Sequence, residues 1–229
     1  MPDSLRIAYA RGVTPGKWAR IWGERFARHP LDLMQVSPVA DAAAELAAAR
    51  EAGAHLAFIR LAAGEVQPEE YHLIALYEER PFVVAPKGNV VEAADEVTLA
   101  DLGGEVRYPF DDDVAVTIEV VAANVGVVVV PQSIARLYAR KDLVARPVAD
   151  AEGWRVGLAW AKDAPEDVRQ HIDEFIGIVR GRTANSSRSE QAGKPAATPP
   201  AASGADRRPK RPAQGRQQRP GRSRRRPTR

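Results

Sequence analysis

The sequence predicts an α/β protein followed by a disordered basic tail, and three observations lead to this fold class. Strand and helix patterns alternate over the first 60 residues, which is typical of parallel strands joined by helices. Residues 120–136 indicate a helix end, a tight turn, a buried strand and a new helix. Beyond residue 184 the chain changes to arginine, proline, glycine and small polar residues, which cannot offset the entropy of ordering.

The first strand and helix are predicted close to the N-terminus. Residues 5–10 alternate as in a strand, and a turn from Gly12 to Gly16 follows. In this turn Thr14 can cap a helix whose first position is Pro15. Apolar residues recur on one face of the helix, at Trp18, Ile21, Trp22 and Phe26. The helix should end before Pro30, and we expect its tryptophans in the core rather than stacked on a ligand.

A second and a third strand continue the alternation. Residues 31–36 indicate a strand, and Ser37-Pro38 indicates a turn. Residues 41–51 form an alanine-rich helix that ends at Gly53. Residues 55–60 then return as a strand. The order β-α-β-α-β implies a parallel sheet, because strands joined through helices run in the same direction.

The segment 120–136 carries the densest structural signal. Asn124 tolerates the left-handed conformation that ends a helix, and Gly126 loosens the turn. The valines at 127–130 suit a strand covered on both faces, and Pro131 opens the next helix. Such a strand brings helix amides to the sheet edge where α/β proteins hold ligands. The alternative, which this segment alone favours, is a plain core strand and helix.

The remaining elements are short strands and a final helix. Residues 82–85 indicate a buried strand between two prolines, and the polar stretch 87–102 continues from it. Residues 154–161 alternate as a strand, and residues 165–180 form an amphipathic helix with Gly181 beyond it. We therefore expect an ordered domain at residues 1–184 and a separate tail at 185–229.

The charge distribution supports this boundary. The whole chain has 33 basic and 30 acidic residues, a net charge of +3. Residues 185–229 hold 13 of the basic residues and only Glu190 and Asp206 as acids, which gives the tail +11 and leaves the body at −8. The near-neutral total therefore combines two oppositely charged segments.

Several classes of protein are disfavoured by what the sequence lacks. The absence of cysteine excludes disulfides and thiolate metal sites. No secretory signal or membrane-spanning run is evident, so we expect a cytoplasmic protein without membrane contact. The four histidines have no partner at metal-ligand spacing, and no nucleophile, zinc or nucleotide motif occurs. We expect neither an enzyme nor a cofactor.

Six short motifs occur in a fixed order along the body, at residues 5–7, 12–18, 54–60, 76–84, 97–102 and 120–131. Their order and spacing resemble the effector-binding domain of LysR-type transcriptional regulators, whose two-lobed fold also occurs in type 2 periplasmic binding proteins. The matches extend over roughly residues 5–180. The last motif is the strongest of them.

The resemblance implies two lobes with a ligand cleft between them. The first lobe would take residues of about 5–76 and 154–181, and the second would take about 82–150. Only residues 103–119 lie where the family usually has an additional strand and helix, so we expect a shortened second lobe.

The resemblance also bears on partners. Because the chain begins where the effector domain begins, we expect a stand-alone copy without the family's N-terminal winged helix-turn-helix. Because the domain also dimerises in full regulators, this copy could pair with itself or with a full-length LysR-type regulator. The sequence leaves open whether an upstream DNA-binding segment was lost through a wrong start site, and it does not identify the effector or the target genes.

Three residues predict a site for a small carboxylate-bearing effector, and two of them, Thr14 and Ser37, stand at positions that match family ligand contacts. Thr14 and Ser37 follow strands at the same sheet edge and can offer hydroxyl groups and amides. Helix capping explains both equally well. Arg60 ends a strand, and its guanidinium can bind a carboxylate through two parallel hydrogen bonds. Its alternative role is a surface salt bridge.

Three consecutive carboxylates at Asp111-Asp112-Asp113 raise the possibility of a metal ion. Consecutive side chains point in different directions, so a helix cap with favourable dipole interaction is the simpler interpretation. We expect no metal site.

The tail predicts contact with nucleic acid. Eleven basic residues and no acid occur between Arg207 and Arg229, which fits salt-dependent binding to phosphates. The residues expected to make these contacts include Arg207, Arg208, Lys210, Arg211, Arg224, Arg225 and Arg226. A solubilising tail is the alternative for this segment. For the whole protein, the alternative is a body without a ligand that carries a tail-driven nucleic-acid binder.

Overall fold

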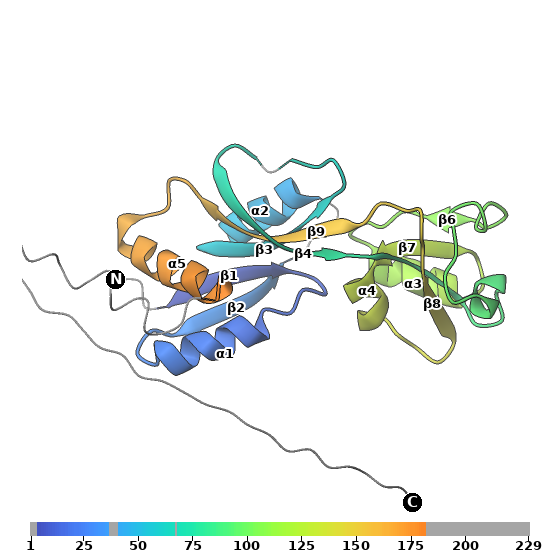
Figure 1. Cartoon of the computed structure of the whole chain (residues 1–229), viewed down its shortest axis with the longest axis horizontal. Helices are drawn as coiled ribbons and strands as arrows, with labels where there is room; N and C mark the ends of the chain where they lie inside the picture. The colour runs from blue at the N-terminus through green and yellow to red at the C-terminus, as the bar shows by residue number, and fades with distance from the viewer. Residues whose placement is uncertain (1–3, 37–40, 67, 182–229) are drawn as a thin grey trace, which may run out of the picture. The chain divides into compact units, whose positions relative to one another are not determined.

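The computed structural model describes residues 4–36, 41–66 and 68–181, which form two β-sheets with helices packed on them (Figure 1). The elements are β1 (Leu5–Ala10), α1 (Gly16–Arg25), β2 (Leu31–Val36), α2 (Ala42–Glu51), β3 (Leu56–Ala62), β4 (Tyr71–Glu79), β5 (Pro81–Pro86), η1 (Val90–Ala93), β6 (Arg107–Tyr108), α3 (Val114–Ala122), β7 (Val127–Pro131), α4 (Gln132–Leu137), β8 (Leu143–Pro147), β9 (Trp154–Ala161) and α5 (Glu166–Val179). Ser37 and every tail residue named above lie outside the described ranges. No helix within these ranges is long and apolar enough to cross a membrane.

The first sheet has the strand order β2-β1-β3-β9-β4. β1 runs parallel to β2 and β3, which confirms the parallel arrangement predicted from the β-α-β-α-β pattern. β9 pairs antiparallel with both β3 and β4, so the sheet as a whole is mixed. β4 is absent from the sequence prediction, because a register shift between Ala75 and Tyr77 interrupts its alternation.

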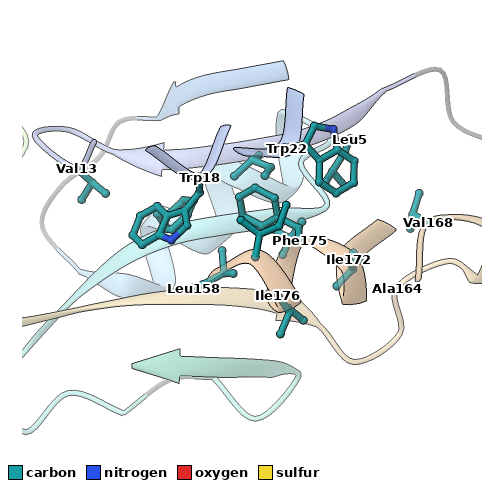
Figure 2. Packing of buried hydrophobic residues seen from close by; sticks show 14 of the residues in the cluster. Leu5, Val13, Trp18, Trp22, Leu158, Ala164, Val168, Ile172, Phe175 and Ile176 are labelled. Carbon is teal, nitrogen blue, oxygen red and sulfur yellow. The ribbon is translucent and has the colours of Figure 1, made fainter. Parts of the chain in front are cut away.

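The main core of this sheet lies beneath α1 and α5 (Figure 2). Trp18 stacks on Phe58 with ring centroids 5.0 Å apart, and Trp22 tilts against Phe175 at 5.9 Å. Both tryptophans are buried, which confirms their predicted core role. Burying one such ring removes roughly 150–250 Å² from water, worth about 4–6 kcal/mol at about 25 cal/mol per Å². Leu46 and the alanines of α2 cover the opposite face of the sheet.

The second sheet has the strand order β6-β7-β5-β8. Its strand β7 comes from the valine run, and both of its faces are covered. Val128 and Val130 pack against α3 and α4, while Val127 faces a second cluster that contains Val91 and Leu102. The prediction of a strand buried on both faces is therefore confirmed.

The turn before β7 depends on two unusual backbone conformations. Asn124 has φ +66° and ends α3 in the left-handed region, as the sequence predicts. Gly126 has φ +138°, and a Cβ there would collide with the carbonyl oxygen of Val106. Glycine is therefore required at Gly126 by both conformation and space. Pro131 precedes α4 as its N-cap, so it stands one position earlier than the first helical residue.

The acidic run before α3 does not cap that helix with a side chain. Asp113 is the N-cap of α3 but its carboxylate accepts no capping hydrogen bond. The Asp111 carboxylate instead accepts a hydrogen bond from the Asp113 amide at 3.0 Å. The expectation of a side-chain cap is wrong, because this local turn occupies the oxygen of Asp111. Within the described ranges, no cluster of carboxylates and histidines could hold a metal ion.

The chain crosses between the two sheets at Arg80, which joins β4 to β5, and again at residues 148–153, between β8 and β9. The first sheet takes its strands from residues 5–79 and 154–161, and the second takes its strands from residues 81–147. Residues 103–119 contain β6 and the first part of α3. The shortening of the second lobe relative to the family stays a prediction.

Candidate functional site

A cleft of about 880 Å³ opens between elements of the two sheets. One wall follows the ends of β1 and β2, the turn into α1, and the end of β4, while the other is α4. The residues that line the first wall are Tyr9, Gly12, Val13, Thr14, Pro15, Gly16, Leu33, Gln35, Tyr77, Glu78 and Glu79. Those that line the second are Gln132, Ser133, Arg136 and Leu137.

The sequence places this cleft at the carboxyl ends of the parallel strands. β1 and β2 end together, and the chain turns at residues 11–15 so that α1 begins beside the cleft. α1 carries no acidic residue in its first turn, which leaves the positive end of its dipole unopposed there. The start of α1 is therefore suited to a negatively charged group, while the carboxylates of Glu78 and Glu79 stand in the same wall.

Thr14 lies in the cleft wall with its side chain exposed. It does not cap α1, because Pro15 occupies the N-cap position and no side chain forms a capping hydrogen bond. The capping interpretation of Thr14 is therefore wrong, and its hydroxyl group faces no competing helix bond. Ser37 follows β2 in the sequence and lies outside the described residues.

The two walls meet closely beside the cleft. Gly12 has φ +86°, and a Cβ on it would lie 2.8 Å from the Ser133 hydroxyl oxygen and 3.1 Å from the Ile134 side chain. The Arg11 guanidinium donates to the Tyr138 hydroxyl group at 3.0 Å. Arg11 and Gly12, which follow β1, therefore lie directly against α4 and the residue after it. Gly12 can approach this closely because it has no side chain.

Arg60 lies in the interior rather than at the protein surface. It is 2% exposed, and its Nε donates to the Glu79 carboxylate at 2.8 Å. Its Nη2 donates at 3.0 Å to both the Arg11 carbonyl oxygen and the Ser133 hydroxyl group. Among the described residues, no group accepts a hydrogen bond from Nη1. Arg60 does not line the cleft, but Glu79 and Ser133 do.

This geometry differs from both interpretations of Arg60 offered by the sequence. Its partner is a buried carboxylate that is only 6% exposed, so the ion pair is not at the surface. The guanidinium joins β3 and β4 of the first sheet to α4, the helix that follows β7 of the second sheet. Glu79, Ser133 and Arg136 are site residues that the sequence prediction missed. Ser133 could have been found, because it stands in the first turn of the helix that follows the valine strand.

Where β3 extends beyond its pairing with β1, two carboxylates accept the backbone hydrogen bonds that a neighbouring strand would otherwise accept. Pairing with β1 reaches Phe58, opposite Tyr9. Beyond that point the Arg60 amide donates to Glu45 at 2.7 Å, and the Ala62 amide donates to Glu65 at 2.8 Å. The backbone of the strand that carries Arg60 is therefore satisfied from α2 and the β3–β4 connection.

Burial gives Glu45 unusual acid–base behaviour. Loss of solvent raises the pKa of Glu45 to about 8, although its hydrogen bond from the Arg60 amide and the charge of Arg60 oppose this shift. Near neutral pH the folded protein therefore holds Glu45 largely protonated. In the cleft, burial and the nearby Glu79 raise the pKa of Tyr77, so its phenol stays a hydrogen-bond donor.

Solved structures share this fold. The chain aligns with a regulatory-domain mutant of OxyR from Pseudomonas aeruginosa at 16% identity and a TM-score of 0.58, covering 79% of this chain and 99% of that one. It aligns with the BenM effector-binding domain bound to its effector benzoate at 16% identity and a TM-score of 0.58, covering 85% and 96%. The chain has the fold of a LysR-type effector-binding domain.

The match also extends to a full-length regulator. CbnR in complex with its target DNA aligns at 14% identity and a TM-score of 0.58, covering 77% of this chain and 70% of that one. All three similar structures are regulators or parts of regulators, rather than enzymes. No protein-family model and no curated protein sequence matches the chain.

Replacing Arg60 with alanine should lower the free energy of unfolding by about 3–5 kcal/mol, because it leaves the Glu79 carboxylate buried without its partner. The double variant Arg60→Met with Glu79→Leu should recover most of this loss, since it removes both charges. Urea denaturation of the three proteins measures the difference. A single variant as stable as the wild type would contradict the assignment of this pair as a buried structural contact.

The contribution of Glu45 to the stability of the protein should fall steadily as the pH rises from about 4.5 to about 8. Over this window the folded protein holds a proton on Glu45 that the unfolded chain has released, so rising pH favours unfolding. Glu45→Gln should remove this contribution, and its stability relative to wild type should increase across the window. Denaturation curves at intervals from pH 5 to 8 test this, with the exposed Glu24→Gln as control. Parallel profiles for wild type and Glu45→Gln would refute it.

Proposed function

We propose that the protein senses a small organic acid, which binds in the cleft between the two sheets, as part of a regulatory function. The observation that carries this proposal is the cleft itself, which is lined by elements of the first sheet and by α4 and is large enough for a small molecule. The fold shared with LysR-type effector-binding domains supports it. BenM is one such protein whose effector domain holds a carboxylate, benzoate.

The cleft offers suitable chemistry for such a ligand. The start of α1 and the Thr14 hydroxyl group provide donors and positive potential on one wall. Arg136 provides a guanidinium on the other. Leu33 and Leu137, both partly exposed, provide apolar surface for the body of the ligand. A carboxylate with a short apolar or aromatic body fits this combination.

Arg60 enters this proposal as a positioning residue. Its guanidinium holds Ser133 and Glu79, two residues of the cleft wall, and is not itself in that wall. For Arg60 to bind a ligand carboxylate directly, its ion pair with Glu79 would have to break first. Ser37, which follows β2, is retained as a proposed ligand contact.

Closure of the cleft is the proposed switch. The hydrogen bonds from Arg60 to Ser133 and from Arg11 to Tyr138 both cross between the sheets. Separation of the two sheets would break both, and the chain crossings at Arg80 and residues 148–153 would act as the hinge. A ligand that contacts both walls would favour the closed arrangement, because it binds that arrangement better.

The basic tail gives this proposal its nucleic-acid component. Arg207, Arg208, Lys210, Arg211, Arg224, Arg225 and Arg226 are the proposed phosphate contacts. The support is compositional: eleven cations without an acid over 23 residues favour binding to polyanions with little sequence preference. Pairing with a second copy or with a full-length LysR-type regulator remains the proposed protein contact.

A second candidate function is a tail-driven nucleic-acid binder whose body has no ligand. The observation that favours it is the engagement of Arg60 by Glu79, which leaves the expected carboxylate-binding group occupied. The two candidates differ in one measurable property. Ligand binding to the folded state must raise thermal stability, whereas a body without a ligand shows no such shift.

Calorimetric titration of the full chain with a panel of small mono- and dicarboxylates should identify at least one that binds. Thr14→Val and Arg136→Gln should each weaken this binding about tenfold, since each removes a hydrogen bond to a charged group. Arg20→Gln, which removes an exposed charge from α1 outside the cleft, is the matched control. If no acid in the panel binds, or if the control loses as much affinity as Arg136→Gln, the cleft assignment is wrong.

Binding of the full chain to a random-sequence DNA duplex should weaken steeply with salt and should be lost in a chain that ends at Ala184. Replacing Arg224, Arg225 and Arg226 with glutamine should reduce the slope of log affinity against log salt by about 3, at roughly 0.9 per phosphate contact. Fluorescence anisotropy over a salt series measures both effects. DNA binding retained by the truncated chain would place the contacts in the body instead.

A further inference from the structure

A second cavity of about 390 Å³ lies in the first sheet, at the N-terminal ends of β1 and β3 and therefore away from the cleft. It is bounded by the end of α2 and the start of α5, and it shares no lining residue with the cleft. Its volume falls in the range of roughly 300–1,000 Å³ that is usual for small-molecule sites. Nothing in the proposed function uses this cavity.

The floor of the cavity is apolar. Aliphatic side chains from α2, β3, β9 and α5 form it, namely Leu46, Ala49, Leu56, Ala57, Ala159 and Val168. Tyr71 and Trp160 add aromatic surface at the side. The six aliphatic residues are buried, whereas Tyr71 and Trp160 are partly exposed. A ligand with an aromatic or branched body would remove the exposed part of these two rings from water.

Two guanidinium groups stand at the rim. The Arg6 side chain lies across Gly53, where a Cβ would be 2.9 Å from its Nη1, and the φ of +70° also favours glycine at that position. Arg6 is exposed, and no ion pair joins it to another residue in the described part of the chain. Arg50 meets a single carboxylate, Asp163, at the long distance of 3.9 Å.

His55 supplies a third donor. Its Nδ1 accepts a hydrogen bond from the Arg6 amide at 3.2 Å. In the neutral ring the proton must then lie on Nε2. Burial and the neighbouring charge of Arg6 lower the pKa of His55, which favours that neutral form. The rim thus combines two guanidinium groups and an imidazole N–H with one carboxylate.

We infer that this cavity is a second ligand site, which takes a small organic anion with an apolar or aromatic body. The anionic group lies between the guanidinium groups of Arg6 and Arg50, and the body of the ligand lies on the apolar floor. Guanidinium groups recognise carboxylates through paired hydrogen bonds, and the apolar floor selects against small inorganic ions. Because every wall belongs to the first sheet and its helices, binding here does not require the cleft to close.

The test is a nuclear magnetic resonance titration of the full ¹⁵N-labelled chain with benzoate, and with benzylammonium as the probe of opposite charge. Benzoate should shift the amide signals of Gly53 and Ala54 and the indole signal of Trp160, while benzylammonium should not. The double variant Arg6→Gln with Arg50→Gln should weaken the benzoate response at these signals at least tenfold. Ala49→Leu, which fills the floor without changing charge, should abolish it.

Two control variants keep this result separate from the proposed function. Arg136→Gln changes the cleft alone and should leave the response at Gly53 and Trp160 unaltered, whatever happens to binding in the cleft. Arg20→Gln controls for the loss of one surface charge. Equal responses to benzoate and benzylammonium, or an unchanged response in the double variant, would overturn the second site.

Discussion

The buried ion pair between Arg60 and Glu79 is the interaction on which the arrangement of the two sheets depends. It joins β3 to β4 across the intervening strand β9, and the same guanidinium reaches Ser133 at the start of α4. Removing two charges from water costs several kcal/mol per ion, and only good geometry with additional hydrogen bonds compensates for it. The carbonyl of Arg11 and the hydroxyl of Ser133 provide those bonds. The pair therefore fixes which surfaces face the cleft rather than adding much net stability.

The support for this ion pair comes from an unusual extension of β3. Beyond Phe58, β3 no longer pairs with β1. The carboxylates of Glu45 and Glu65 instead accept hydrogen bonds from the amides of Arg60 and Ala62. One of these acids is largely protonated at neutral pH, so the extension is held without placing a full negative charge beneath Arg60. Strand, ion pair and cleft wall are in this way parts of one network.

The sequence predicts the elements of this fold well and the contacts between them poorly. Strands β1, β2 and β9 have the predicted bounds, because alternation and nearby prolines or glycines mark their ends. The conformation of Asn124 also follows from local chemistry. β4 is not predicted, because its register shift interrupts the alternation of residues between the two faces of the strand. The partners of Arg60 escape it because Glu79 and Ser133 lie 19 and 73 residues away, beyond any local pattern.

The contact between Gly12 and Ser133 determines how closely the two walls of the cleft approach each other. Because no atom separates the Gly12 backbone from α4, the distance between the two walls is set there by the absence of a side chain. A methyl group at this position would have to displace the Ser133 hydroxyl group, to which Arg60 also donates a hydrogen bond, and would therefore strain this contact. If the cleft closes as proposed, the turn that leads into α1 therefore limits how closely the two walls can approach, and this limit does not depend on any ligand.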